Sequence, residues 1–222
     1  MDIFLSNIHN EFEAFVQALI PFFKQVGTQL LVVISGPSGV GKDSVIQCMK
    51  ERKLPFRFVV TVTTRARREG EVNGVDYFFV SREEFAELIE AGEMLEYAYV
   101  YNDYKGVPKE QVSLALESGD DVVMRVDVQG AATLRRLYPG ALMVFLMTED
   151  ERIMIERLEE RNSEDPDELK LRIATARKEL ERVDEFEYLV INRQNKLDET
   201  VDKILAIMAA EHQRVRPRDL AS

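Results

Sequence analysis

Five short, continuous apolar runs are the most regular feature of the chain. They lie at residues 30–34, 58–62, 122–126, 141–147 and 188–191. A short apolar run bounded by glycine or polar residues is typical of a strand that is buried on both faces of a parallel sheet. Segments with helical periodicity separate the runs, and Ser81 and Thr148 each open one with the capping-box pattern, in which Glu follows three residues later. The alternation predicts an α/β fold with a central, mainly parallel sheet covered by helices on both sides.

Two regions break this alternation, and we expect both to move. Residues 65–108 are rich in Arg, Gly, Tyr and Glu, which indicates an inserted lobe. Residues 159–168 form a charged run without apolar anchors. Because a charged run is usually a solvated face, the mobility of the second region is a hypothesis that rests on its arginines.

Residues 1–28 carry apolar side chains at steps of three or four, at Phe4, Ile8, Phe12, Phe15, Leu19 and Phe22. This spacing predicts an amphipathic helical extension. Its apolar face can pack on the same subunit, form a homodimer contact or lie on a membrane surface, and the sequence leaves the three open. The longest apolar run here, residues 18–23, contains Pro21 and is too short to span a bilayer. Acidic residues precede its first lysine, unlike in a secretory signal, so we expect a cytoplasmic protein, with an organelle matrix as the alternative.

The charge balance narrows the range of partners. The 222-residue chain has a formal net charge of −11, with 45% hydrophobic and 31% charged residues, as in a globular protein. A nucleic-acid backbone would repel so acidic a chain, so we expect no nucleic-acid partner and expect local clusters of cations wherever a phosphate binds. Cys48 is the only cysteine, which excludes an intrachain disulfide and a multi-cysteine metal site.

A glycine-rich segment follows the first apolar run directly and precedes a helical pattern. It consists of Gly36, Pro37, Ser38, Gly39, Val40, Gly41, Lys42, Asp43 and Ser44. In a P-loop of this kind the glycines turn backbone N–H groups around a phosphate, the helix N-terminus faces the anion, and Lys42 reaches the β- and γ-phosphate oxygens of a nucleoside triphosphate. The strict motif has Ser or Thr after the lysine as a Mg²⁺ ligand, where this chain has Asp43. We expect Ser44 to supply the hydroxyl, while Asp43 reaches Mg²⁺ through a water or caps the helix.

A second cluster of cations lies in residues 61–79. Arg65, Arg67 and Arg68 occupy three of four consecutive positions, and a guanidinium fork suits bidentate capture of a phosphate. Tyr77 adds a hydroxyl donor. Taken alone, the segment equally fits surface arginines that pair with Glu69 and Glu71.

The chain resembles guanylate kinases from about Leu30 to its C-terminal helix. Four motifs in the same order carry the resemblance, namely GPSGVGK, TTRARREGEVNGVDYFF, LEYA at residues 95–98 and VDVQG at residues 126–130. It implies that Arg65, Arg68 and Tyr77 hold the phosphate of GMP, and that Thr61, Glu96 and Asp127 face the guanine. Acidic acceptors complement the N1–H and the amino group of guanine, whereas the unprotonated N1 of adenine would leave a buried carboxylate unpaired.

The resemblance also implies an activity and a domain plan. The activity is Mg²⁺-dependent transfer of the γ-phosphoryl group of ATP to GMP, with dGMP as a further acceptor. The plan is a three-layer P-loop kinase domain over residues 29–214, a GMP-binding lobe at about 61–108, a mobile lid at about 157–172 and a C-terminal tail at 215–222. The cations expected to act in catalysis are Lys42, Arg65, Arg157, Arg161 and Arg172. Asn192, after the last predicted strand, is a candidate contact for adenine.

Three positions depart from the family pattern. Lys105 stands before Gly106 where most members have a phosphate-binding tyrosine, and we expect it to replace that hydrogen bond with a charge. Val107 stands where a small hydroxyl residue is common, and Arg125 where many members have an aspartate. Two alternatives remain, a non-catalytic guanylate-kinase-like module that binds proteins and a P-loop kinase for another phosphate ester.

Overall fold

The computed structural model describes residues 29–100, 102–161 and 166–220. The expected amphipathic helix over residues 1–28 lies outside the described residues, and so does the homodimer contact that it would form. No helix in the described ranges has the length and apolar character that crossing a membrane requires.

The core is a five-stranded sheet in which every neighbouring pair of strands is parallel. Its spatial order is β2-β7-β1-β8-β9, with β1 at Leu31–Ser35, β2 at Phe56–Phe58, β7 at Asp121–Arg125, β8 at Leu142–Met147 and β9 at Tyr188–Ile191. β1 lies at the centre of this order. All five of its residues are buried, because both faces of the sheet are covered there. The parallel α/β fold predicted from the apolar runs is confirmed.

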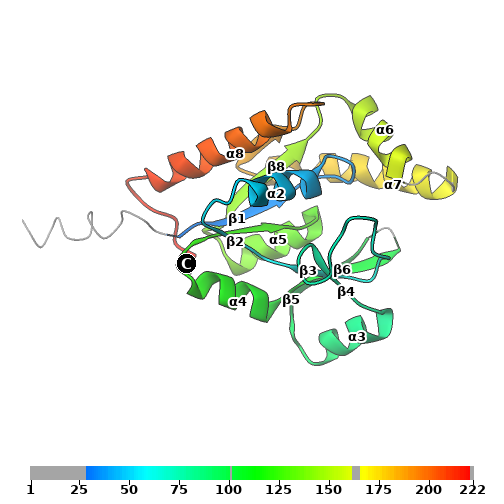
Figure 1. The fold of residues 1–222 in the computed structure, drawn as a ribbon, viewed down its shortest axis with the longest axis horizontal. Helices are drawn as coiled ribbons and strands as arrows, with labels where there is room; N and C mark the ends of the chain where they lie inside the picture. The colour runs from blue at the N-terminus through cyan, green and yellow to red at the C-terminus, as the bar shows by residue number, and fades with distance from the viewer. Residues whose placement is uncertain (1–28, 101, 162–165, 221–222) are drawn as a thin grey trace, which may run out of the picture.

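Helices cover both faces of this sheet, which gives three layers (Figure 1). Val32 and Ile34 of β1 pack in one apolar core with helices α2 (Lys42–Glu51), α6 (Glu151–Arg161), α7 (Pro166–Leu180) and α8 (Leu197–His212). Leu31 and Val33 point to the opposite face and pack with α4 (Lys109–Glu117) and α5 (Val128–Leu137). The alternation follows the two-residue period of a strand.

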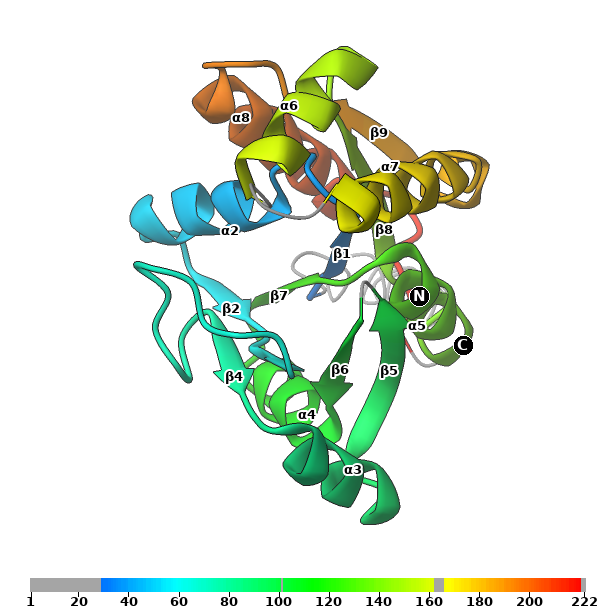
Figure 2. The ribbon, with the colours of Figure 1, turned by 90° about the vertical axis from the view of Figure 1, so that its right-hand side faces the viewer.

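A second, four-stranded sheet forms a lobe beside the core (Figure 2). Its order is β4-β3-β6-β5, with β3 at Thr61–Thr63, β4 at Tyr77–Phe79, β5 at Met94–Val100 and β6 at Asp103–Pro108. β3 and β4 are parallel, and β6 is antiparallel to both β3 and β5. Helix α3 (Arg82–Glu90) packs on this sheet through the fully buried Phe85. The lobe occupies the segment that interrupted the sequence pattern.

The run at residues 58–62 is not one strand. Its first residue ends β2 in the core sheet, and its last two lie in β3 of the lobe sheet. The backbone N–H of Val59 still donates to Val123 O at 3.0 Å, after which the chain leaves the core. A continuous apolar run cannot reveal this break, because the residues on either side of it are buried in different sheets.

One of the two predicted capping boxes is correct. The Ser81 hydroxyl accepts from the N–H of Glu84 at 3.1 Å, and the Glu84 carboxylate accepts from the N–H of Ser81 at 2.7 Å. The box at Thr148 is wrong. Asp150 caps α6 instead, with its carboxylate accepting from the N–H of Arg152 at 2.8 Å, while the Thr148 hydroxyl donates to Asp150 O. Aspartate is as good an N-cap as threonine, so the sequence offers both Thr148 and Asp150 as caps, and Asp150 is the residue that caps α6.

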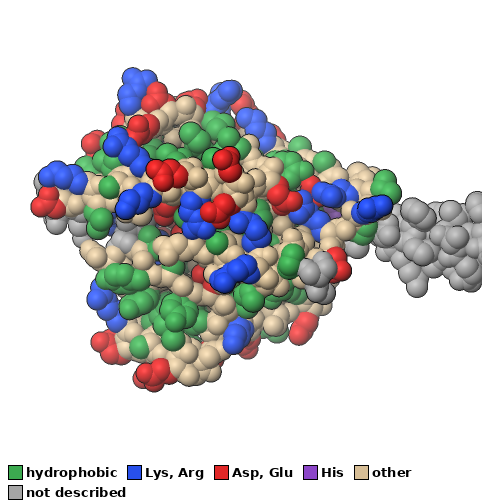
Figure 3. Space-filling model, turned by 180° about the vertical axis from the view of Figure 1, so that it is seen from behind, with side chains coloured by type: hydrophobic (Ala, Val, Ile, Leu, Met, Phe, Trp, Pro, Cys, Tyr) green, Lys and Arg blue, Asp and Glu red, His purple; other side chains and the backbone are tan. Residues whose placement is uncertain are grey.

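The segment after α8 packs against the domain. Arg218 pairs with Glu211 of α8 at 2.7 Å and with Glu187 at 2.8 Å. The backbone oxygen of Asp219 lies only 2.1 Å from where a Cβ on residue 140 would stand, so only glycine allows this approach. The surface seen in Figure 3 intersperses acidic with basic side chains.

Candidate active site

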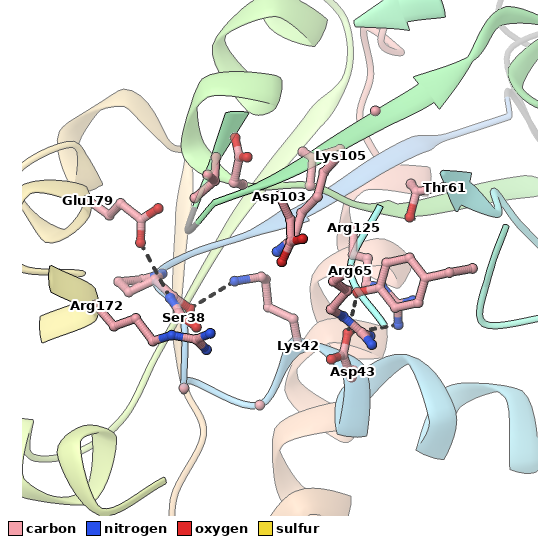
Figure 4. Close-up of a pocket in the computed structure, with 18 of the residues that line it drawn as sticks. Ser38, Lys42, Asp43, Thr61, Arg65, Asp103, Lys105, Arg125, Arg172 and Glu179 are labelled. Carbon is pink, nitrogen blue, oxygen red and sulfur yellow. Dashed lines mark hydrogen bonds and ion pairs between the residues drawn. The ribbon is translucent and has the colours of Figure 1, made fainter. Parts of the chain in front are cut away.

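One open cleft, with about 930 Å³ of space, lies where the core sheet, the lobe and α7 meet. Most of the predicted site residues line it, namely Pro37, Ser38, Gly39, Gly41, Lys42, Asp43, Thr61, Arg65, Arg68, Tyr77, Glu96, Lys105, Asp127 and Arg172. Figure 4 shows the labelled side chains pointing into this space from both sides. Gly36, Val40, Ser44, Arg157 and Asn192 do not line the cleft, and the side chain of Arg161 lies outside the described residues.

The P-loop is fixed by two close approaches that need glycine. Gly36 has a φ of +138°, and a Cβ there would lie 2.2 Å from the backbone oxygen of Leu146 in β8. Gly41 has a φ of +91°, and its Cβ would lie 2.4 Å from the amide nitrogen of Asn192. At both glycines the backbone has a positive φ and lies so close to neighbouring atoms that a side chain would not fit.

Asn192 supports the P-loop from behind. It is buried, its Nδ2 donates to Val40 O at 2.8 Å, and its Oδ1 accepts from the Thr200 hydroxyl at 3.1 Å. The sequence did not reveal this role, because Thr200 lies in a helix with no motif. The expected contact of Asn192 with adenine stays a prediction.

Lys42 lies inside the loop that it is expected to serve. Its Nζ donates to Gly36 O at 2.5 Å and to Pro37 O at 2.8 Å. Burial lowers the pKa of Lys42 to about 8, and the carboxylate of Glu179 opposes this shift. Among the described residues its hydrogen bonds go to neutral carbonyls, so an anionic phosphate would stabilise the charged ammonium.

The carboxylate of Glu179 was not predicted at the site. Glu179 lies in α7, is 5% exposed, and accepts a long hydrogen bond of 3.4 Å from the backbone N–H of Ser38. Arg172 and Ala176 precede it at steps of four and three, so one face of α7 turns toward the P-loop. The helical spacing from Arg172 was the available signal for Glu179, which lies beyond the charged run at residues 159–168.

Arg65 is held in place by a carboxylate of its own segment. It makes two hydrogen bonds to Glu71, at 2.7 and 2.5 Å, and its guanidinium lies 4.8 Å from the centre of the Tyr77 ring. The Arg–Glu pairing that the sequence left as an alternative is therefore present. Because Arg65 itself lines the cleft, the ion pair with Glu71 orients Arg65 and does not remove it from the site.

Asp43 faces the lobe. Its carboxylate accepts from the Tyr77 hydroxyl at 3.1 Å, lies 3.0 Å from Nη1 of Arg125, and lies 4.0 Å from Nη1 of Arg68. Lys105 of β6 also lines this part of the cleft. Burial lowers the pKa of Lys105, with Asp127 and Asp43 opposing.

A buried carboxylate also lines the cleft. Glu96 of β5 is 7% exposed, and burial, followed by the charge of Asp127, raises the pKa of Glu96 to about 8. Gly130 makes room for it, because the two Glu96 carboxylate oxygens lie 2.8 and 3.0 Å from where a Cβ would stand. Asp127 caps α5 by accepting from the N–H groups of Gln129 and Gly130 at 2.8 and 2.9 Å. Thr61 lines the cleft as well.

Comparison with known proteins now assigns the chain to a family. The family model described as guanylate kinase matches residues 28–211. The chain belongs to the guanylate kinase family. It is 48% identical over 190 residues to guanylate kinase 2, chloroplastic/mitochondrial, of Oryza sativa subsp. japonica, which covers 85% of this chain and 67% of that protein.

A bacterial relative and a solved structure agree with this assignment. Guanylate kinase of Bacillus subtilis is 40% identical over 193 residues, covering 85% of this chain and 94% of its own. The crystal structure of guanylate kinase from Anaplasma phagocytophilum superimposes with a TM-score of 0.70 at 28% identity, covering 85% of this chain and 88% of that one. The prediction of an enzyme with the guanylate kinase fold is confirmed.

The lid expected at about residues 157–172 spans the end of α6, residues 162–165 outside the described ranges and the start of α7, and it stays a prediction. Arg172 of α7 points into the cleft beside the P-loop (Figure 4). Arg157 of α6 instead lies behind the loop and donates to Val40 O at 3.4 Å. Closure that would carry Arg157 and Arg161 onto a triphosphate stays a prediction.

The donor atoms around the P-loop fit a Mg²⁺ ion that arrives with its nucleotide. Across the described ranges, no three acidic, His or Cys side chains come together as a preformed metal site. Mg²⁺ usually keeps several waters and takes only one or two protein oxygens beside substrate phosphates. Asp43 lines the cleft and can supply one, while Ser44 is exposed in the first turn of α2. The preference for Ser44 over Asp43 as ligand stays a prediction.

Proposed function

We propose that this chain transfers the γ-phosphoryl group of ATP to the phosphate of GMP, with each nucleotide bound at one side of the cleft. The observation that carries the proposal is the position of Glu96, a buried carboxylate in the same cavity as a P-loop lysine and two phosphate-binding arginines. ADP and GDP are the products.

The ATP side consists of the P-loop and its supports. Backbone N–H groups from Ser38 to Ser44 surround the phosphates, and Lys42 leaves its carbonyl partners for the β- and γ-phosphate oxygens. Arg172 adds a second cation from α7. Bound with ATP, Mg²⁺ neutralises phosphate charge, and Asp43 or Ser44 supplies its protein oxygen.

The GMP side is divided between phosphate and base. Arg65, Arg68, Tyr77 and Lys105 offer cations and a hydroxyl to the phosphate. Glu96 and Asp127 accept from the N1–H and amino group of guanine, and Thr61 adds a hydroxyl. Since none of these roles involves the ribose 2′-hydroxyl, dGMP is an acceptor as well.

The chemistry needs no general base. A phosphate monoester with a second pKa near 6 is already an anionic nucleophile at neutral pH. The obstacle is the approach of two anions, so the residues act by in-line positioning and by neutralising charge. Arg65, held by Glu71, and Lys42, held in the P-loop, both line the cleft in which the phosphoryl group is transferred.

A coupled ADP-release assay tests the proposal. MgATP is combined with GMP, dGMP, IMP, AMP, UMP and ribose phosphates, using the wild type and Lys42→Ala. We expect turnover with GMP and dGMP, weak turnover with IMP because it lacks the amino group, and loss of on the order of 10²-fold or more in Lys42→Ala. Folded protein without turnover on any acceptor supports the protein-binding alternative, and a preference for a sugar phosphate supports the other kinase.

The compartment and the assembly stay predictions. The rice relative is named chloroplastic/mitochondrial, and the bacterial relatives carry no such term. An organelle matrix therefore remains beside the cytoplasm as a proposed location, and a homodimer through residues 1–28 remains a proposal.

A further inference from the structure

Arg125 is a buried cation in the cleft that neither the P-loop nor the arginine-rich segment includes. It lies at the end of β7 and is 9% exposed. Its Nη1 lies 3.0 Å from the Asp43 carboxylate, and its Nη2 donates to Asp76 O at 2.5 Å. The flat face of the guanidinium lies 4.1 Å from the centre of the Tyr77 ring. One side chain thus contacts the P-loop helix and two consecutive lobe residues. Figure 4 shows Arg125 beside Asp43.

The Tyr77 hydroxyl has one proton and can donate it to one acceptor at a time. It donates its single proton to Asp43 at 3.1 Å. If the acceptor phosphate is to receive that hydrogen bond, the hydroxyl has to leave Asp43. Arg68, whose Nη1 lies 4.0 Å from Asp43, has several N–H donors and can bind a phosphate without leaving this carboxylate.

Asp43 would also oppose the phosphate by its charge. A phosphate monoester carries about −1.5 to −2 charges at pH 7. An acidic side chain close to that position repels it unless a cation remains beside the carboxylate. Arg125 is suited to remain, because its place is fixed by the Asp76 carbonyl and the Tyr77 ring as well as by Asp43.

We propose that Arg125 is a positioning residue of the acceptor-phosphate site, which keeps Asp43 neutralised and Tyr77 aligned while the Tyr77 hydroxyl passes from Asp43 to the phosphate. The inference rests on the proposed function and adds a residue to it. It also gives Asp43 a role on the acceptor side of the P-loop.

The test is a pair of substitutions at the two ends of the ion pair. Arg125→Met removes the charge at similar volume and is expected to raise the KM for GMP on the order of tenfold or more, while the KM for ATP changes less than about threefold. Adding Asp43→Asn removes the carboxylate whose charge Arg125 no longer balances. The KM for GMP of the double variant should then fall back toward that of the wild type.

A merely structural role predicts a different pattern. Arg57, an exposed arginine of β2 that pairs with Asp120, gives the control Arg57→Ala, which should leave both KM values unchanged. The inference is overturned if the KM for GMP is unchanged in Arg125→Met, or if Asp43→Asn brings no recovery. Wild-type turnover with GMP is measured first, so its absence would count against the proposed function rather than against Arg125.

A conservative variant covers the case in which Arg125→Met does not fold. Arg125→Lys keeps the charge beside Asp43 but cannot fork between Asp43 and Asp76 O. We expect a smaller rise in the KM for GMP than a tenfold one, and calorimetric titration with GMP alone should show the same weakening. Arg125→Lys with the wild-type KM and affinity for GMP would show that the forked contacts are not needed, and would overturn the alignment of Tyr77.

Discussion

Glu96 shows how one buried side chain can serve recognition at the expense of its own solvation. Its carboxylate lies against Gly130 and near Asp127, so its charged form is disfavoured in the empty cleft, and its pKa is raised from an ordinary 4.5 to about 8. Guanine offers two donors, and a carboxylate accepts both only when it is deprotonated. With Glu96 facing guanine as proposed, we expect binding of GMP to be coupled to release of a proton from Glu96.

This coupling predicts how GMP affinity depends on pH. Between pH 7 and 8.5 the free wild type changes from mainly protonated to mainly ionised Glu96, so the Kd for GMP should fall roughly fivefold or more. The GMP phosphate, with a second pKa near 6, contributes little in this range. Calorimetry in two buffers of different ionisation heat should count close to one proton released at pH 7.

Glu96→Gln is the matched control. It keeps the size of the side chain and every other titrating group of the cleft, including Lys42 and Lys105. Its Kd for GMP should be weaker at pH 8.5 and should lack the improvement seen in the wild type. An equal improvement in Glu96→Gln would assign the proton to another group.

At the scale of elements, α7 links the lid to the P-loop. The same face of this helix carries Arg172, which points into the cleft, and Glu179, which accepts from the N–H of Ser38. Glu179 is also the strongest neighbouring charge that holds the pKa of Lys42 up against the effect of burial. The helix therefore tunes the P-loop lysine as well as supplying a cation.

Glu179→Gln should shift the alkaline limb of the pH profile. Without the carboxylate, the pKa of Lys42 falls further below about 8, and Lys42 loses its proton at lower pH. The profile of kcat/KM for ATP, which reports the free enzyme, should then begin to fall at lower pH than in the wild type. Glu83→Gln, an exposed change on α3, should leave the profile in place. A fall at higher pH than in the wild type would contradict the assigned charge effect.

At the scale of the whole molecule, the C-terminal segment closes the fold around one buried ion pair. Arg218 and Glu211 have side chains that are only 8% and 3% exposed, and Tyr188 donates to the same carboxylate. Glu211 also meets Arg214, whose side chain is 50% exposed. Two arginines thus share one carboxylate at very different depths.

These depths predict unequal effects on thermal stability. Arg218→Ala leaves a buried carboxylate short of its main partner and should cost about 3 kcal/mol, seen as a fall of several degrees in Tm. Arg214→Ala removes a largely solvated pair and should cost less than about 1 kcal/mol. Equal shifts in Tm for the two variants would show that the segment after α8 does not depend on the buried pair.

The sequence predicted the parts of this molecule whose signals are local. A few consecutive residues are enough to recognise a strand buried on both faces, the P-loop and the arginine-rich segment. Glu179 could not be found in this way, and Arg125 stood out as a departure from the family pattern without its role, because the partner of a charged residue in space is not encoded locally. The orientation of Asp43 depends on Arg125 in β7, and the support of the P-loop by Asn192 depends on Thr200 in α8.

The core and lobe sheets share no strand pairing among the described residues. On the side of Tyr77, their contact runs through Asp43, Arg125 and Lys50, whose Nζ donates to Val75 O at 2.9 Å. Separating the core from the lobe at these side-chain contacts would leave the strand pairing within each sheet intact. We therefore expect a substitution such as Lys50→Ala, which removes one of these contacts away from the proposed phosphate sites, to change the rate at which GDP leaves.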